Sequence, residues 1–241
     1  MATPLDQFEI TRIVPIRLGE LDLSFTNSAL WMVAAVVLVT LLLTFSMRGR
    51  ALVPTRSQSI GEILYEFIAN MLRDNVGTAG RPYFPFVFSL FMFILFGNLL
   101  GLIPGSFTFT SHLIVTFGLA IVVFIGATII GFVHHGAKFL TFMTPHGAPL
   151  WTLPIIIPIE LVSYLSRPVS LSVRLFANMT VGHLMLKVIA GFVPALGIVF
   201  GIVPLLGLVA VYALEFIIAV VQAYVFAILT CIYLYDAIHM H

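Results

Sequence analysis

The sequence has few charged residues and a single cysteine. Only 9% of its 241 residues are charged and 61% are hydrophobic, whereas a soluble globular domain carries about 25% charged residues. The net charge of +1 provides no clustered basic surface of the kind that nucleic-acid binding requires. Cys231 has no second cysteine with which to form an internal disulfide, and its apolar surroundings predict a small packed hydrophobe. The composition therefore favours an integral membrane protein.

Other common signals are also missing. The sequence contains no tandem repeat, no glycine-rich phosphate loop and no low-complexity tract. Its first residues, MATPLDQFEITR, lack a basic region directly followed by an apolar core, so they do not resemble a secretory signal. We expect residues 1–28 to form a short outer arm and residues 29–241 to form a single helical membrane domain.

Long apolar runs define the expected spans, because about 20 apolar residues are needed to cross about 30 Å of hydrocarbon. Residues 29–47 satisfy this requirement and are followed by Arg48, Arg50 and Arg56. Basic residues favour the cytoplasmic side, which predicts an outer N-terminus and a cytoplasmic C-terminus. Residues 83–103 and 113–133 form a predicted hairpin of two more spans, joined by an outer link without lysine or arginine.

Residues 59–75 show a different pattern. Their apolar side chains recur at helical spacing, while Glu62, Glu66 and Arg73 occupy other positions around the helix. This pattern is typical of an amphipathic helix lying in the membrane interface rather than crossing the bilayer.

The last two apolar segments, 151–190 and 204–238, are unusually long. A continuous helix over the second would measure roughly 50 Å and would need a tilt of about 55° to stay within the hydrocarbon layer, against a usual tilt of about 20°. We predict that both helices form a channel and lie strongly tilted. The expected fold is all-α and integral to the membrane, with about five membrane helices and one interfacial helix.

A histidine-rich segment separates the predicted hairpin from the long helices. His134, His135 and His146 lie there beside Lys138. Their spacing matches no standard metal-ligand pattern, so we interpret them as loop histidines and expect neither a metal nor another cofactor. A membrane-embedded metal hydrolase using these histidines with Glu160 is the less favoured alternative.

Polar residues form a stripe on the first long helix. At 100° per residue they fall within about an 80° arc of an otherwise apolar helix, and they are Glu160, Ser163, Arg167, Ser170, Arg174 and Asn178. A charged group inside a membrane costs at least about 2.5–3.5 kcal/mol, which favours a functional explanation. The alternative is contacts between helices within the chain. Too few carboxylates lie in the spans to neutralise the arginines, since only Glu160 and Glu215 are candidates. A partner protein is therefore expected to supply the missing carboxylate.

Titratable residues occupy a second face. His183 lies about 180° around the helix from Arg174, and Glu215 and Gln222 share one face of the last helix because they are seven residues apart. If the two helices pack antiparallel, His183 meets Glu215. A histidine and a carboxylate together form a proton-binding pair, since histidine titrates near neutral pH; an ordinary buried histidine is the alternative. The pattern predicts a fixed cation beside a proton path.

These segments resemble a known family. SRPVSLSVRLFANMTVGH (166–183), the preceding IPIELVSYL, the later LEFIIAVVQAYVFAILTCIYL and NLLGLIPGSFTFTSHL from residue 98 resemble subunit a of F-type ATP synthases. The resemblance extends over about residues 5–240. It implies a non-catalytic subunit that carries protons past a rotating ring of c subunits. It also implies contacts with the b subunits of the peripheral stalk, other subunits of the complex and membrane lipids.

The resemblance assigns roles to individual residues. Arg174 corresponds to the essential arginine that attracts the ring carboxylate and blocks a direct proton leak between two half-channels. Four residues match the outer half-channel, namely Asn178, His183, Glu215 and Gln222. Three match the inner half-channel less closely, namely Glu160, Ser163 and Ser170.

One departure from many bacterial members concerns the acid–histidine pair. His183 stands where those members have an acid, and Glu215 where they have a histidine, an exchange shared with the mitochondrial branch and its bacterial relatives. The exchange keeps one acid and one imidazole and favours protons over sodium. A bacterial inner membrane is expected, with the mitochondrial inner membrane as the alternative. A secondary transporter is the other function considered, although no internal repeat supports it.

Overall fold

The computed structural model of the protein describes residues 9–15, 17–18, 21–22, 24–48, 54–103, 105–136, 139 and 152–239. Arg50, Lys138, His146 and Trp151 lie outside these residues, as do residues 1–8 of the expected arm. The elements are β1 (Arg12–Val14), β2 (Arg17–Leu18), β3 (Leu21–Asp22), β4 (Phe25–Thr26), α1 (Asn27–Met47), α2 (Arg56–Val76), η2 (Thr78–Tyr83), α3 (Phe84–Gly101), η3 (Phe109–Ser111), α4 (Leu113–His135), α5 (Leu153–Ala195), α6 (Gly197–Phe200) and α7 (Ile202–Ile238).

The segment before α1 contains short strands that the sequence analysis does not predict. Strand β1 pairs antiparallel with β4, and β2 pairs antiparallel with β3. The Asn27 side chain accepts a hydrogen bond from the Thr11 backbone N–H at 3.2 Å and donates one to the Glu9 carbonyl at 3.1 Å. These bonds attach the described part of the arm to the first turn of α1.

The helical membrane fold is confirmed. Five helices are long and apolar enough to cross a membrane, namely Asn27–Met47, Thr78–Gly101, Leu113–His135, Pro154–Ala195 and Ile202–Ile238. The last two are the longest, as predicted: α5 has 43 residues and α7 has 37. At 1.5 Å per residue these helices measure roughly 65 and 55 Å, about twice the thickness of the hydrocarbon layer.

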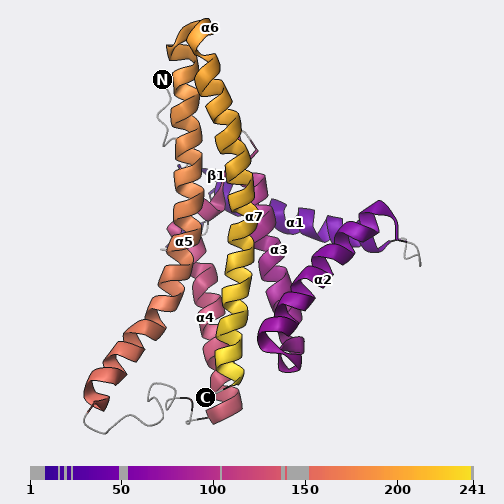
Figure 1. The fold of residues 1–241 in the computed structure, drawn as a ribbon, viewed down its shortest axis with the longest axis vertical. Coiled ribbons are helices and arrows are strands. Elements are labelled where there is room, and N and C mark those ends of the chain that lie inside the picture. The colour runs from indigo at the N-terminus through magenta and orange to yellow at the C-terminus, as the bar shows by residue number, and fades with distance from the viewer. Residues whose placement is uncertain are drawn as a thin grey trace.

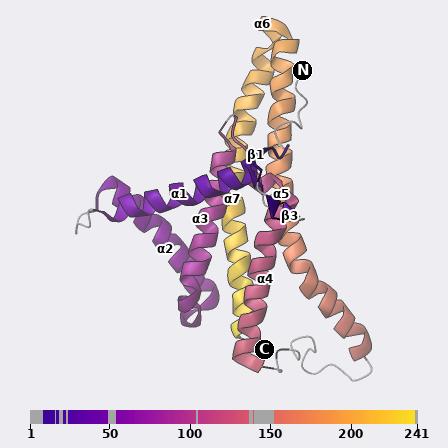
Figure 2. The same ribbon diagram turned by 180° about the vertical axis from the view of Figure 1, so that it is seen from behind.

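The two long helices run side by side from the short α6, which joins them at one end of the molecule (Figure 1). The N-terminal part of α5 diverges from α7. Pro158 and Pro168 lie inside α5, and a proline within a helix removes a backbone hydrogen bond and bends the helix. Helix α1 runs across the direction of α7 rather than along it (Figures 1 and 2). The strong tilt of α5 and α7 in the membrane stays a prediction.

Helix α7 forms the centre of the core and packs against α2, α3, α4 and α5. The small residues Ala219, Ala223, Ala227 and Cys231 are each 0% exposed and are spaced four residues apart. Such a row lets neighbouring helices approach closely, which is the usual basis of helix association in membranes. The burial of Cys231 confirms its interpretation as a small packed residue.

Helix α2 is amphipathic but does not bury its whole apolar side. Ile68 and Leu72 are buried in the core, whereas Ile60 and Ile63 are 52% and 64% exposed. Thr55 caps the helix by accepting a hydrogen bond from the Gln58 N–H at 3.4 Å. The exposed isoleucines leave an apolar strip free for lipid, in keeping with an interfacial position.

Candidate functional site

The antiparallel packing of α5 and α7 brings His183 and Glu215 together. His183 Nδ1 lies 3.3 Å from Glu215 Oε1, and the two residues are only 7% and 2% exposed. The predicted meeting of these residues is thus confirmed. The contact lacks the geometry of a hydrogen bond, and both Glu215 oxygens are without a hydrogen-bond partner among the described residues.

Gly182 allows the carboxylate to lie against α5. A Cβ atom built at this position would be 2.8 Å from Glu215 Oε1 and 3.0 Å from its carboxyl carbon. Any larger residue would push Glu215 away from α5. No pattern in the sequence marks this glycine, since only the packed structure shows that it faces the Glu215 carboxylate.

We predict that Gly182→Ala destabilises the protein by about 1–3 kcal/mol, because the added methyl group overpacks a buried contact. It should also slow proton transport, because it displaces Glu215. Thermal inactivation and proton flow of the assembled complex measure the two effects. Gly191→Ala is the matched control on the same helix, since its Cβ would have no atom within 4 Å. Equal behaviour of the two variants would show that the close approach at Gly182 is unimportant.

A pocket of about 460 Å³ opens beside the buried pair. It lies between the C-terminal end of α3, the loop that follows α3, and the facing parts of α5 and α7. Its polar lining residues are Ser106, His183, Lys187 and Tyr212. Because His183 lines this pocket, the pocket connects the His183 side chain with the space beside the predicted outer link.

Two residues outside the predicted set help to build this region. Thr108 Oγ1 lies 3.0 Å from His183 Nε2, and the Tyr212 hydroxyl donates to the Leu102 carbonyl at 3.1 Å. Thr108 belongs to the link between α3 and α4, and Tyr212 to an apolar stretch of α7. The sequence carries no signal for either contact, because it does not show how the link folds onto α5 or how the end of α3 packs against α7.

His112 stands near this region at the N-cap of α4. Burial lowers the pKa of His112 below its ordinary value. Its ring stacks on Phe107 at 5.0 Å between centroids. His112 is therefore neutral at pH 7 and adds no positive charge here.

A second polar contact joins the long helices nearer their middle. Asn178 Nδ2 donates to Gln222 Oε1 at 2.7 Å. Gln222 is buried and Asn178 is exposed, so the pair connects the interior of the helix pair with the surface of α5. The sequence analysis assigns both residues to the same half-channel but does not predict that they touch.

Arg174 is exposed on that surface of α5, one helical turn from Asn178. In the part of the chain that the structure describes, its guanidinium forms neither a hydrogen bond nor an ion pair, although its charge acts on Tyr233. Arginine is always protonated in proteins. The helix pair therefore presents on its polar stripe a permanent cation that no carboxylate of the described chain neutralises.

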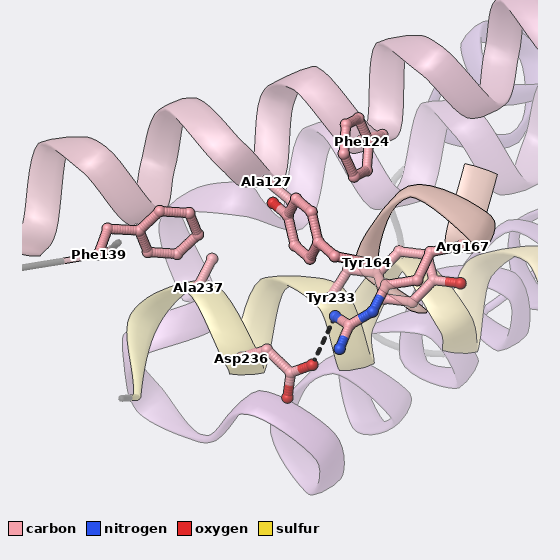
Figure 3. A pocket seen from close by; sticks show the side chains of 8 residues that line it. All are labelled: Phe124, Ala127, Phe139, Tyr164, Arg167, Tyr233, Asp236 and Ala237. Carbon is pink, nitrogen blue, oxygen red and sulfur yellow. Dashed lines mark hydrogen bonds and ion pairs between the residues drawn. The ribbon is translucent and has the colours of Figure 1, made fainter. Parts of the chain in front are cut away.

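The other arginine of the stripe is neutralised within the chain, which corrects the sequence analysis. Arg167 Nη1 lies 2.8 Å from Asp236 Oδ2, and its guanidinium carbon lies 5.3 Å from the Tyr164 ring and 5.4 Å from the Tyr233 ring. Figure 3 shows this arrangement. The interpretation of Glu160 and Glu215 as the only available carboxylates is wrong. Antiparallel packing returns the last turn of α7, with Asp236, to the level of Arg167.

The residues predicted for the inner half-channel are less closely gathered. Glu160 is partly exposed, and Ser163 and Ser170 are exposed, all on the same helix. The described structure places no second titratable side chain in hydrogen-bonding or ion-pair contact with Glu160. Along α5 these three residues lie on one side of Arg174, while Asn178 and His183 lie on the other.

The histidines considered as metal ligands have other contacts. His134 Nε2 lies 3.3 Å from the Tyr83 hydroxyl, and His135 Nε2 lies 3.0 Å from the Ile238 carbonyl. His146 is outside the described residues. Among the residues that were described, no three His, Cys, Asp or Glu side chains form a group able to hold a metal ion.

The chain is similar to known proteins over its whole length. A family model described as ATP synthase A chain matches residues 29–235. ATP synthase subunit a of Paramagnetospirillum magneticum is 61% identical over 247 residues, covering 100% of both chains. The subunit a of Rhodospirillum rubrum is 57% identical over 241 residues, again covering 100% of both. That of Pelagibacter ubique is 53% identical over 243 residues, with the same coverage.

Proposed function

Because the chain belongs to the ATP synthase A chain family, we propose that it carries protons through two half-channels past the carboxylates of a rotating c ring. The chain is a non-catalytic membrane subunit of the synthase, so ATP is made in other subunits. The observation that carries the proposal is the position of Arg174. It is an exposed cation without a hydrogen bond or ion pair in the described chain, and it lies between two groups of polar residues on α5.

The outer half-channel leads from the pocket to the exposed face of α5. A proton enters beside His183 and Lys187 and reaches the His183–Glu215 pair. The hydrogen-bonded Gln222 and Asn178 continue the polar line towards Arg174. The proton then passes to an ionised ring carboxylate, which the guanidinium has attracted and oriented.

The inner half-channel begins on the other side of Arg174. Glu160, Ser163 and Ser170 provide its polar surface, where α5 diverges from α7. Arg167 is not part of the barrier, because Asp236 neutralises its charge. A proton cannot move directly between the two half-channels, because Arg174 repels it and cannot relay it.

The membrane supplies the driving force. One elementary charge crossing 100 mV releases about 2.3 kcal/mol, so several protons are needed for each ATP.

The protein is integral to the membrane, and its bacterial relatives favour a bacterial inner (plasma) membrane. In the proposed orientation the N-terminus is outside and the C-terminus is cytoplasmic. The expected partners are the c ring, the b subunits of the peripheral stalk, other subunits of the synthase and lipids.

Disulfide cross-linking tests which face of α5 meets the ring. Val181 is 53% exposed and lies on the Arg174 side of the helix, while Val169 is 48% exposed and lies about 140° away from it. We predict that Val181→Cys cross-links to a cysteine placed beside the ring carboxylate in the assembled complex, and that Val169→Cys does not. The reverse result would place Arg174 away from the rotor. Isolation of the chain without a ring, active as a self-sufficient transporter, would favour a secondary transporter instead.

A further inference from the structure

Thr108 contacts the proton-binding pair from outside the two long helices. It lies in the link after α3 and is only 6% exposed. The Ser111 hydroxyl donates to the Thr108 carbonyl at 2.6 Å, which fixes the backbone. The Thr108 side chain rests on Gly101, where an added Cβ would be 2.6 Å from Oγ1. The hydroxyl is therefore held in one position facing His183.

This hydroxyl has two neighbours but only one hydrogen. Oγ1 lies 3.2 Å from the Gly101 carbonyl oxygen and 3.0 Å from His183 Nε2. A carbonyl can only accept, whereas an imidazole nitrogen can donate or accept. If Thr108 donates to Gly101, then His183 Nε2 must carry a hydrogen and donate it to Thr108.

The end of α3 favours this assignment. Gly101 is the last residue of α3, and the last four carbonyls of a helix have no partner within the helix. Gly101 is buried, and a buried carbonyl without a hydrogen bond is costly. Ser106 also lies near this oxygen at 3.0 Å, but its hydroxyl is closer to the Ile103 carbonyl, at 2.7 Å. If the single hydroxyl hydrogen of Ser106 goes to its nearer acceptor, the Ile103 carbonyl, then Thr108 is the donor to Gly101.

We propose that Thr108 is a positioning residue that keeps a hydrogen on His183 Nε2 and so makes Nδ1 and Glu215 share the transported proton. The inference rests on the proposed function, since it concerns the same proton path. With Nε2 protonated, a neutral His183 turns the lone pair of Nδ1 towards Glu215 Oε1, 3.3 Å away. An ionised Glu215 facing that lone pair is repelled. One added proton, on the carboxylate or on Nδ1, removes the repulsion.

The change between the two states is a single proton. The empty pair has a carboxylate and a neutral imidazole, with a net charge of −1. The loaded pair has gained one proton and is neutral overall, whether the proton is on Oε1 or on Nδ1. Thr108 destabilises the empty state, and it therefore raises the tendency of the pair to take up a proton from the pocket.

The other charged and titratable groups around His183 remain the same when Thr108 is changed. Lys187 lies one turn along α5 and lines the same pocket. On α7 the neighbouring groups are Glu215 and Tyr212, whose hydroxyl is bonded to Leu102. Helix α3 contains no Asp, Glu, His, Lys, Arg or Tyr, and the near end of α4 contributes the neutral His112. Among the described groups, Thr108 alone contacts Nε2.

Removal of the hydroxyl should release this constraint. In Thr108→Val the neutral imidazole can move its hydrogen to Nδ1 and donate it to an ionised Glu215. This stabilises the empty pair, so proton loading requires a lower pH. We expect the pH midpoint of proton-driven ATP synthesis, measured against the pH on the outer side, to fall by about one unit, equivalent to about 1.4 kcal/mol.

The experiment uses the assembled synthase in sealed vesicles under a constant imposed membrane potential. Thr108→Ser keeps the hydroxyl and should retain the wild-type pH midpoint. Thr108→Val keeps the shape of the side chain but lacks the hydroxyl, so its pH midpoint should fall. If Thr108 acted only through packing, the serine variant would depart from the wild type and the valine variant would not, because serine lacks the methyl group. Thr108→Ala provides a second variant without the hydroxyl if the valine variant assembles poorly. Each rate is divided by the amount of assembled complex.

The outcomes separate the two proposals. A wild-type midpoint in both Thr108→Val and Thr108→Ala would overturn the role of Thr108. His183→Ala is measured in parallel. Wild-type proton flow in that variant would overturn the proposed path itself, whereas a loss of flow together with unshifted Thr108 variants rejects only the inference about Thr108.

Discussion

Arg174→Ala is expected to abolish proton-driven ATP synthesis while the complex still assembles. Arg174 is exposed and has no hydrogen bond or ion pair in the described chain, so its loss breaks no contact that holds the subunit together. It does remove the cation that attracts the ring carboxylate and separates the half-channels. Without this cation the ionised ring carboxylate is an unpaired charge in the membrane, at a cost of about 3 kcal/mol or more. A barrier higher by that amount corresponds to a loss of about 100-fold or more in rate.

The measurement is ATP synthesis in sealed vesicles under an imposed proton gradient, divided by the amount of assembled complex. Arg56→Ala is a matched control, since Arg56 is an exposed arginine at the start of α2 and away from the site. It should keep the wild-type rate. Arg174→Lys is informative as well, because lysine retains the charge but loses protons more readily when desolvated. Full synthesis in Arg174→Ala would contradict the barrier.

Glu215→Gln is expected to slow proton flow at neutral pH by about 100-fold, the usual scale for loss of a positioned proton-transfer group. Glutamine has nearly the same shape but cannot bind and release a proton. Glu215 is 2% exposed and lies 3.3 Å from His183. The exchange therefore removes half of the proton-binding pair with little change in packing.

Passive proton flow and ATP-driven pumping should fall together in this variant, because both use the same path. Glu66→Gln is the control: Glu66 is exposed on α2, outside the proposed path. We expect it to behave as wild type. Unchanged flow in Glu215→Gln would remove this carboxylate from the path and leave His183 as an ordinary buried histidine.

The prediction for Arg174 depends on its difference from Arg167, although the two arginines look alike in the sequence. Arg167 and Arg174 lie seven residues apart on the same polar stripe. The structure separates them, because Asp236 at the far end of α7 neutralises Arg167 and no carboxylate of the described chain reaches Arg174. The distinction rests on a contact between residues 69 positions apart, and helical periodicity contains no information about such contacts.

The sequence alone determined the class of fold, the family and the set of polar residues on the long helices. The length of an apolar run indicates the length of a membrane helix, because a helix needs about 20 mostly apolar residues with few charges to cross a bilayer. Periodicity then places side chains on faces, so the shared face of Glu215 and Gln222 follows from their spacing.

Only the tertiary structure decided which of these groups touch. Packing of α5 against α7 joined His183 to Glu215 and Asn178 to Gln222, and the fold of the link after α3 brought Thr108 to His183. Gly182 acquired its importance in the same way, from the carboxylate that it faces. The physical reason is that helix spacing fixes directions along one helix, whereas contacts between helices depend on how their surfaces fit together.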